Sequence, residues 1–164
     1  IAVIWPLALV VTPSTTLNVP AYKIASFEIT DIPLIELVAS KGKPVIISTG
    51  IAEQEDIELA LDACKRMGNT NIALLKCTSS YPAPIEEANM CMVKDLAERY
   101  GVISGLSDHT MGSTVPIVAA AFGAKIIEKH FILDRSIGGA DASFSMNEEE
   151  FAAMVKVVRE AESA

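Results

Sequence analysis

The chain has 164 residues, 51% of them hydrophobic, and a formal net charge of −8, so it is long enough for one domain with a buried core. The acidic balance argues against nucleic acid and anionic membranes as partners, and no apolar run approaches the roughly 20 residues that a membrane-spanning helix needs. The cysteines, Cys64, Cys77 and Cys91, are odd in number and have no CxxC spacing. This pattern favours a reducing compartment, so we expect the chain in the cytoplasm.

Residues 1–17 have no clear period, although a strand is expected near Ile1–Ile4. The chain becomes regular from residue 18, so we treat 1–17 as an atypical N-terminal segment and 18–164 as one domain. Short apolar runs predict strands at Ala21–Ala25, Pro44–Ile47, Ile72–Leu75, Val102–Leu106 and Lys125–Glu128. Periodicity and capping residues predict helices from Asp31 to about Ser40, at Glu53–Met67, Met90–Tyr100 and Ser113–Gly123, and from Asn147 to about Glu160.

One predicted helix separates each strand from the next, which is the pattern of a parallel α/β sheet. A closed (β/α) barrel has eight such units in about 250 residues, and this chain has five. It is therefore either a small open doubly wound sheet or the latter part of a longer, TIM-type barrel. No GxGxxG or GxxxxGK[ST] motif follows any strand, which removes the best support for nucleotide binding.

Polar residues follow each predicted strand. The carboxyl ends of parallel strands meet at one edge, where α/β proteins place their sites. Hydroxyls and an ammonium group around one point suit a phosphate or a carboxylate. A plainer interpretation is that Ser and Thr side chains bond to loop backbone where strands end. The residues at these ends are Lys23, Ser26, Glu28, Ser48, Thr49, Thr78, Ser79, Tyr81 and Ser107.

The two histidines of the chain, His109 and His130, follow successive predicted strands. Parallel neighbours lie about 4.8 Å apart, so both imidazoles can reach one ion or one substrate oxygen. They are ligands of a divalent metal that acts as a Lewis acid, catalytic or substrate-binding residues without a metal, or structural residues. The spacing alone leaves all three interpretations open.

Lys129 is an alternative reactive centre, because a lysine at a barrel strand end can form a Schiff base with a carbonyl substrate. Strand alternation places Glu128 and His130 on one face and Lys129 on the other. An inward-facing His130 therefore counts against a Schiff base on Lys129. Asp141 lies in the long, glycine-containing loop Phe131–Ser145, where it is either a substrate contact or a solvated side chain.

Five segments, each at a predicted strand end, resemble the sialic acid synthase family. FEITDIPLI and LLKCTSSYPAP look closer to the pseudaminic acid synthases than to the N-acetylneuraminate synthases, and the resemblance runs from about Asn18 to the C-terminus. The segments are AYKIASFEITDIPLI (21–35), KPVIISTGIA (43–52), LLKCTSSYPAP (74–84), GLSDHTMG (105–112) and GAKIIEKHFILDRSIGGADASFS (123–145).

The resemblance implies a TIM-barrel enzyme that condenses phosphoenolpyruvate with an open-chain N-acetylated amino sugar. The products are a nine-carbon 2-keto sugar acid of the pseudaminic acid type and phosphate, with N-acetylneuraminate or legionaminate synthesis as alternatives. It also implies a Mn²⁺ or Mg²⁺ ion on His109 and His130, a homodimer for the full-length protein, and a structural role for Lys129. By the same resemblance, phosphoenolpyruvate contacts Lys23, Ser26, Ser48, Ser79 and Ser107, the sugar faces Glu28, Tyr81 and Asp141, and His109, His130 and Glu28 are catalytic.

The chain also departs from the family pattern. Residues 1–17 do not resemble the family, and Ala140 stands where proline is expected. This chain has no counterpart of the family's first barrel strands, which carry an acidic residue and a further lysine of the active site. It also has no counterpart of the family's C-terminal antifreeze-like domain. We therefore expect this chain to be inactive alone, or active only in association with those segments. The alternative is a (β/α) fragment that binds an anionic ligand without chemistry.

Overall fold

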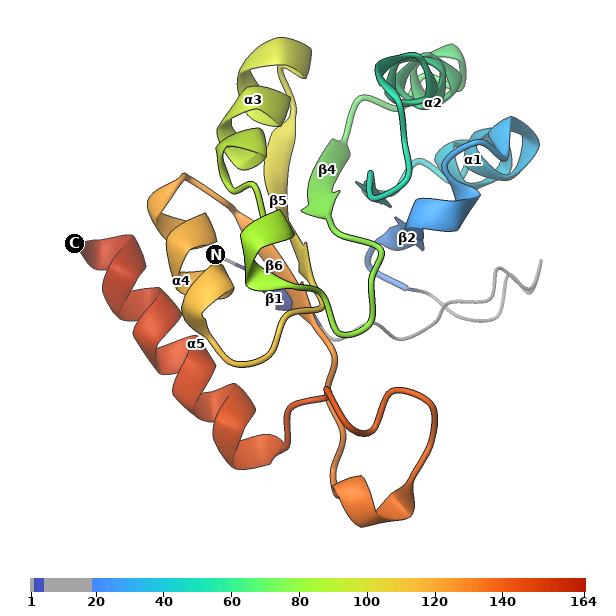
Figure 1. Ribbon diagram of the computed structural model, residues 1–164. Coiled ribbons are helices and arrows are strands. Elements are labelled where there is room, and N and C mark those ends of the chain that lie inside the picture. The colour runs from blue at the N-terminus through green and yellow to red at the C-terminus, as the bar shows by residue number, and fades with distance from the viewer. Residues whose placement is uncertain (1, 5–18) are drawn as a thin grey trace.

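Five parallel strands, each followed by one helix, make up most of the computed structural model, which describes residues 2–4 and 19–164 (Figure 1). These strands are β2 Tyr22–Ile24, β3 Val45–Ser48, β4 Ile72–Cys77, β5 Ile103–Asp108 and β6 Ile126–Lys129. The helices that follow them are α1 Ile32–Ala39, α2 Gln54–Arg66, α3 Cys91–Tyr100, α4 Thr114–Ala121 and α5 Glu148–Ser163. Three short 3-10 helices are η1 Ser26–Glu28, η2 Ile85–Glu87 and η3 Arg135–Ile137.

The strands form one sheet in the order β1-β6-β5-β4-β3-β2, and every pair is parallel. From β2 to β6 the spatial order follows the chain, which is the arrangement of a half-barrel and confirms the five predicted βα units. A sixth strand, β1 Ala2–Ile4, pairs with β6 at the far edge and confirms the strand expected near Ile1–Ile4. The rest of the atypical segment 1–17 lies outside the described residues.

The helix boundaries follow local capping chemistry. The Asp31 carboxylate accepts a hydrogen bond from the Leu34 amide at 3.1 Å, and the Asn147 side chain accepts one from the Glu150 amide at 2.9 Å, so both predicted caps are confirmed. Gly101 ends α3 with a φ of 64°, a conformation that glycine adopts at little cost. Among the described residues, every helix is too short or too polar to cross a membrane.

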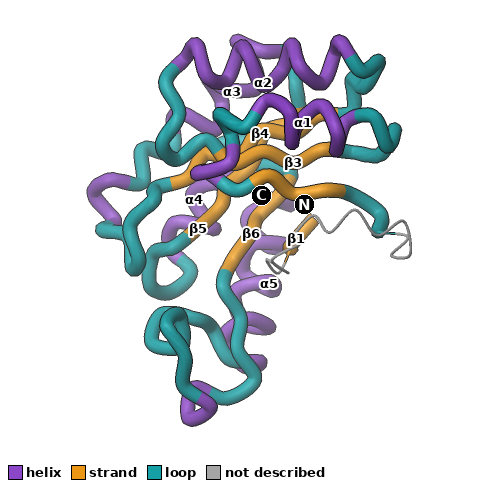
Figure 2. The backbone as a smooth tube through the Cα atoms, turned by 90° about the vertical axis from the view of Figure 1, so that its right-hand side faces the viewer, coloured by secondary structure: helices purple, strands orange, loops and turns teal. Residues whose placement is uncertain are grey.

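The helices cover the convex face of the curved sheet (Figures 1 and 2). Alternate strand residues point toward them, because successive side chains of a strand face opposite sides. The buried core beneath α1 and α2 includes Ile24, Val45, Ile47, Ile72 and Leu74, and Ile127 packs against Met154 and Val158 of α5. Burial of these side chains holds each helix on its strand.

The concave face carries the other set of strand side chains. Toward the amino ends of the strands it is apolar, with Ile46, Ala73 and Leu75 packed beside Ile126. A cavity of about 330 Å³ opens there, and Ile103 on its wall is 54% exposed. The inner face of the half-barrel is thus uncovered at one end and, as described below, polar at the other.

Four strands run further than the sequence predicts, and the first is β3, which ends at Ser48 rather than at Ile47. β4 continues to Cys77, β5 to Asp108 and β6 to Lys129, whereas the apolar runs predict ends at Leu75, Leu106 and Glu128. The reason is that these added polar side chains find partners across the sheet, so the ladder tolerates them. Residues predicted to follow the strands are therefore held rigidly within them.

A substitution at Gly105 can test whether the close approach of β5 and β6 requires glycine at this position. A Cβ at this position would lie 2.2 Å from the backbone oxygen of its neighbour Ile126, and the backbone there cannot yield cheaply. We predict that Gly105→Ala lowers the free energy of unfolding by about 1–3 kcal/mol or more, measured by urea titration. Ile103→Val, at an exposed position of the same strand, should change it by less than about 0.5 kcal/mol. Equal effects of the two substitutions would contradict the steric argument.

Candidate active site

At the carboxyl ends of the strands, the concave face becomes a ring of polar side chains. Strand alternation places the polar side chains at the strand ends on the same face of the sheet as Ile46 and Ala73. Cys77, Ser107 and Glu128 are also direct Cα partners across β4, β5 and β6, so the parallel register brings them level. One residue from each strand contributes: Lys23, Ser48, Cys77, Ser107 and Glu128.

Lys23 is the cation of this ring. Its ammonium donates to the Ser48 hydroxyl at 2.8 Å and lies 3.7 Å from a carboxylate oxygen of Glu128. Burial lowers the pKa of Lys23, and the negative charges of Glu128 and Glu28 offset only part of that effect. A partly desolvated ammonium of this kind attracts an anion more strongly than an exposed one.

Glu128 is buried and incompletely satisfied. Its Oε1 accepts a hydrogen bond from the Ser107 hydroxyl at 2.7 Å, but its Oε2 has no hydrogen-bond partner. Buried polar atoms are almost always paired in folded proteins. A buried carboxylate oxygen that is ion-paired with Lys23 at 3.7 Å but has no hydrogen bond therefore indicates a place for a ligand or a water.

A second cluster of hydroxyls surrounds Gly50, just after β3. The Gly50 amide donates to the Ser26 hydroxyl at 3.1 Å, and the buried Ser79 hydroxyl has no hydrogen-bond partner. A Cβ on Gly50 would lie 2.2 Å from the Ser79 Oγ and 2.8 Å from the Ser26 Oγ. Only glycine at position 50 leaves room for both hydroxyls. Together with the Lys23 ammonium, the Ser26 and Ser79 hydroxyls form a cradle for an anionic group.

The structure brings the two imidazoles together beside this cradle. The ring centroids of His109 and His130 are 5.2 Å apart. Tyr81 stacks on His109 at 4.1 Å and meets His130 edge-on at 6.0 Å. Phe144 packs against His130 at 5.0 Å and lies 5.9 Å from Tyr81, so aromatic rings fix both imidazoles in place.

Hydrogen bonding indicates which ring nitrogens are available. The Nδ1 of His109 lies 2.9 Å from the carbonyl oxygen of Thr78, and a carbonyl can only accept, so this nitrogen carries the proton. The Nδ1 of His130 faces the Asp141 carboxylate at 3.6 Å. A neutral His109 therefore has its free lone pair on Nε2, which is the arrangement of metal-binding histidines, and a neutral His130 that turns a protonated Nδ1 toward Asp141 has the same arrangement.

These imidazoles fit a divalent metal, although they do not complete its coordination. Among the described residues there is no group of three or more His, Cys, Asp or Glu side chains that could hold a metal ion. Two neutral imidazoles suit Zn²⁺, Mn²⁺ or a similar ion that takes its other ligands from water or substrate. The separation of the two rings and their free Nε2 atoms are consistent with one shared ion.

The thiol of Cys77 lies between the two parts of the site, 3.8 Å from the Nδ1 of His109. Burial raises its pKa, but hydrogen bonds with His109, Ser26 and Ser107 bring the pKa below its usual value. Burial lowers the pKa of His109, and its hydrogen bonds to Cys77 and Thr78 raise it overall. Burial and the neighbouring His109 lower the pKa of His130.

Not every residue predicted for the site faces its centre. The Glu28 carboxylate accepts a hydrogen bond from the Ala25 amide at 2.8 Å within η1 and reaches the ring only through its charge on Lys23. Thr49 bonds the Leu75 carbonyl at 3.1 Å, and the Thr78 hydroxyl bonds the Glu87 carbonyl at 3.2 Å. For these two threonines the plainer interpretation holds, because their hydroxyls satisfy backbone.

Sequence reasoning missed four contributors to the site: Cys77, Glu128, Gly50 and Phe144. Alternation already placed Glu128 on the face of His130 without giving it a role, and it could also have found Cys77, which is two residues before Ser79. Gly50 follows two hydroxyl residues in a loop, and only the folded arrangement reveals the close approach of Ser79. Phe144 comes from the distant end of the loop after β6, and no local pattern marks it.

Lys129 faces away from the site, as alternation predicts. Its side chain is 1% exposed, and its ammonium is paired with the Asp108 carboxylate at 2.6 Å. Schiff-base formation needs a neutral, accessible amine. The buried ion pair therefore argues against Lys129 as a nucleophile.

Comparison with known protein families matches residues 10–164 to the NeuB family. The chain is similar to a pseudaminic acid synthase of Helicobacter pylori, with 49% identity over 145 residues that make up 88% of this chain and 43% of that protein. It is also similar to an N,N'-diacetyllegionaminic acid synthase of Legionella pneumophila, with 41% identity over 90% of this chain and 43% of that protein. The chain thus spans less than half the length of these relatives.

The fold also matches a solved structure. A crystal structure of an N-acetylneuraminic acid (sialic acid) synthetase from Leptospira borgpetersenii, in complex with citrate, superposes with a TM-score of 0.85 and 37% identity. The match covers 89% of this chain and 51% of that one. The half-barrel described above therefore has the architecture of the matched half of that protein.

Gly50 provides a direct test of the anion cradle. We predict that Gly50→Ala weakens phosphate binding by about tenfold, measured by ³¹P NMR titration, because the added methyl group displaces the Ser79 and Ser26 hydroxyls. Gly50→Ala/Ser79→Ala removes the closest clash and should recover stability without recovering affinity. Unchanged phosphate binding by Gly50→Ala would show that the hydroxyls do not form the cradle.

Proposed function

The chain belongs to the NeuB family, and we propose that it is part of a synthase that condenses phosphoenolpyruvate with an open-chain N-acetylated amino sugar. The product is a nine-carbon 2-keto sugar acid of the pseudaminic acid type. This choice is supported by the 49% identity to a pseudaminic acid synthase. The 41% identity to a legionaminic acid synthase and the likeness to a sialic acid synthetase make those products the alternatives.

One observation carries the proposal: a desolvated ammonium, several hydroxyls and two imidazoles meet at the carboxyl ends of the strands. Lys23 donates to Ser48, while the Ser79 hydroxyl has no partner. In this proposal, phosphate and carboxylate oxygens of phosphoenolpyruvate take up those donors. The contacts are Lys23, Ser26, Ser48, Ser79 and Ser107.

His109 and His130 would hold the divalent ion, Mn²⁺ or Mg²⁺. When bound, such an ion acts as a Lewis acid that polarises the sugar aldehyde. The protein prepares for it by holding the Nδ1 of His109 against the Thr78 carbonyl, which keeps Nε2 free. The buried setting beside Tyr81 and Phe144 also strengthens electrostatic interactions by excluding water.

The reaction joins the methylene carbon of phosphoenolpyruvate to the aldehyde carbon of the sugar. Water then adds at C2, and phosphate leaves with cleavage of its C–O bond. In this proposal Tyr81 and Asp141 face the sugar, and so does Glu28, whose carboxylate would have to exchange its hydrogen bond with the Ala25 amide for one to the substrate. Tyr81 is 47% exposed and Asp141 and Glu28 are exposed, so these residues remain accessible to a large substrate.

We propose a homodimer for the full-length protein and a cytoplasmic location. The free state of Cys64, Cys77 and Cys91 supports a reducing compartment. The net charge of −8 supports small-molecule substrates rather than nucleic acid or an anionic membrane.

A second candidate function is binding of an anionic ligand without chemistry. It is favoured by the limited metal-ligand set, since the described residues contain no group of three or more His, Cys, Asp or Glu side chains that could hold a metal ion. In that case the cradle around Gly50 would bind phosphoenolpyruvate whether or not a divalent ion is present.

We predict that His109→Ala/His130→Ala abolishes specific Mn²⁺ binding by the chain, measured by isothermal titration calorimetry, because the two imidazoles supply the protein ligands. Glu148→Ala/Glu149→Ala removes exposed acidic side chains from the first turn of α5 and should leave this binding unchanged. Mn²⁺ binding that survives the double histidine substitution would exclude this metal site.

Synthase activity can be tested in a chimera in which residues 18–164 replace the matching segment of the Helicobacter pylori relative. We predict that the chimera releases phosphate from phosphoenolpyruvate when the amino sugar is present. The same chimera with His109→Ala/His130→Ala should lose activity by about 100-fold or more. A folded chimera that binds phosphoenolpyruvate independently of Mn²⁺ and releases no phosphate would favour the second function.

A further inference from the structure

The ammonium of Lys129 is fully satisfied inside the protein. It donates to the Asp108 carboxylate at 2.6 Å, to the Gly112 carbonyl at 3.1 Å, and to the Thr110 carbonyl. A lysine ammonium has three protons, so each has an acceptor. The side chain is 1% exposed and lies on the opposite face of β6 from the candidate active site.

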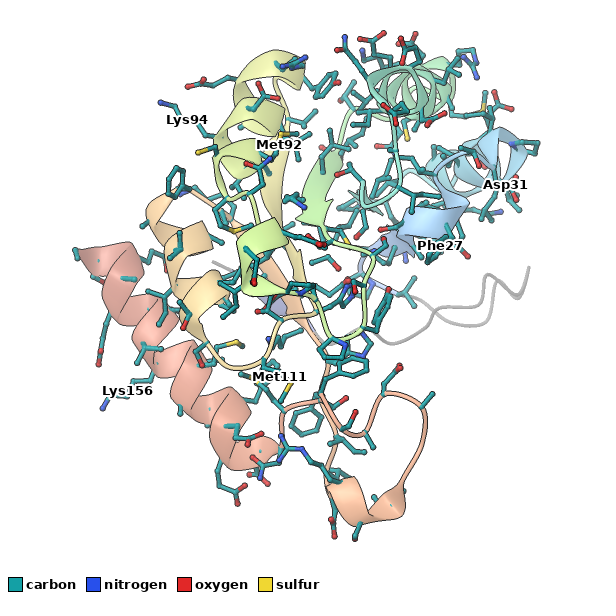
Figure 3. All side chains as sticks on the ribbon, viewed as in Figure 1. Phe27, Asp31, Met92, Lys94, Met111 and Lys156 are labelled. Atoms are coloured by element: carbon teal, nitrogen blue, oxygen red, sulfur yellow. The ribbon has the colours of Figure 1, made fainter. Side chains whose placement is uncertain are left out.

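All three acceptors come from one short loop. Asp108 ends β5, and its second carboxylate oxygen accepts the Thr110 amide at 3.0 Å. The loop 108–112 therefore folds around the ammonium, and its tip residue Met111 is exposed (Figure 3). Gly112, with a φ of 75°, provides the backbone turn that presents its carbonyl. His109 lies inside this loop.

The charged pair lies directly behind the imidazole pair. Asp108 and Lys129 are Cα partners across β5 and β6. His109 directly follows Asp108 in the chain, and His130 directly follows Lys129. The centroids of the two imidazole rings are 5.2 Å apart. One buried contact on the outer face thus joins the two backbone segments whose next side chains enter the site.

We propose that Lys129 and Asp108 are positioning residues that set the separation of the two imidazoles. The role of this separation in metal binding rests on the proposed function. The ammonium gathers the loop that carries His109 against the strand that leads into His130. Removing Lys129 leaves the buried Asp108 carboxylate without its cation and two carbonyls without a donor, which favours opening of the loop.

The proposal differs from a purely stabilising role in what the paired replacement does. A buried ion pair can be exchanged for apolar side chains with little loss of stability. Asp108→Leu/Lys129→Met should therefore be more stable to denaturant than Lys129→Met, which leaves the Asp108 carboxylate buried without its cation. It still lacks the ammonium that holds Thr110 and Gly112, so the imidazoles should remain misplaced.

The first test uses the metal-free chain. The chain has only two histidines, so selective histidine labelling gives NMR signals from these two rings alone. We expect ring-to-ring NOE cross-peaks in the native chain and their loss in both Lys129→Met and Asp108→Leu/Lys129→Met. Because no metal is needed, this result is independent of whether the proposed function is correct. Native-like cross-peaks in the stable double variant would overturn the proposal.

The second test measures Mn²⁺ affinity of the same variants by calorimetry. Groups that orient metal-binding histidines are typically worth 10–100-fold in affinity, so we expect a loss of about tenfold or more in both. Glu36→Gln breaks an ion pair with Arg66 between α1 and α2 at 2.8 Å and should bind Mn²⁺ as the native chain does. Native-like affinity of Asp108→Leu/Lys129→Met would assign the pair a stabilising role only.

Discussion

Alternation of side chains along parallel, in-register strands is the constraint on which this structure depends. A strand must present every second residue to each face, and here one face meets helices while the other lines the interior of a half-barrel. Lys23, Ser48, Cys77, Ser107 and Glu128 therefore all stand on the inner face, where Cys77, Ser107 and Glu128 are level with one another. A shift of any strand by one residue would send its polar side chain into the helix layer and an apolar one into the site. The chemistry of the site and the packing of the core are thus fixed by the same register.

The two faces of the sheet differ in how completely their buried charged and polar groups are hydrogen-bonded. On the outer face, Lys129 and Asp108 are buried with every donor and acceptor paired. On the inner face, the Ser79 hydroxyl and one oxygen of Glu128 have no hydrogen-bond partner, and burial lowers the pKa of Lys23. Buried polar atoms without hydrogen bonds are costly, so the two on the inner face mark where a ligand contributes the missing contacts; the Thr110 hydroxyl, in the loop around Lys129, is a third such atom. The fully hydrogen-bonded pair of Lys129 and Asp108, which lies behind these inner-face residues, holds the site in its shape.

The sequence predicts much of this arrangement because the signals are local. Apolar runs and caps such as Asp31 and Asn147 define the βα units, and the strand ends identify Lys23, the serines and both histidines. Strand ends are less well predicted, since Cys77, Asp108 and Lys129 join the ladder only because partners on neighbouring strands satisfy them. Gly50 and Phe144 escape detection for a similar reason: their roles depend on contacts with Ser79 and His130, which are far away in the sequence. The proposed substrates were inferred from the resemblance to a known family, because no residue spacing indicates which molecules bind.

The strand order carries a consequence for how the molecule is made. From β2 to β6, each strand pairs with the one synthesised just before it. Each βα unit leaving the ribosome can therefore dock on a finished neighbour, and only short loops need to close at each step. The pairing of β1 with β6 is the exception, because it joins segments that are far apart in the sequence, with Ala2 opposite Ile126, and it can form only after β6 has been synthesised. Assembly is thus sequential along most of the sheet, with one late, long-range contact at its edge.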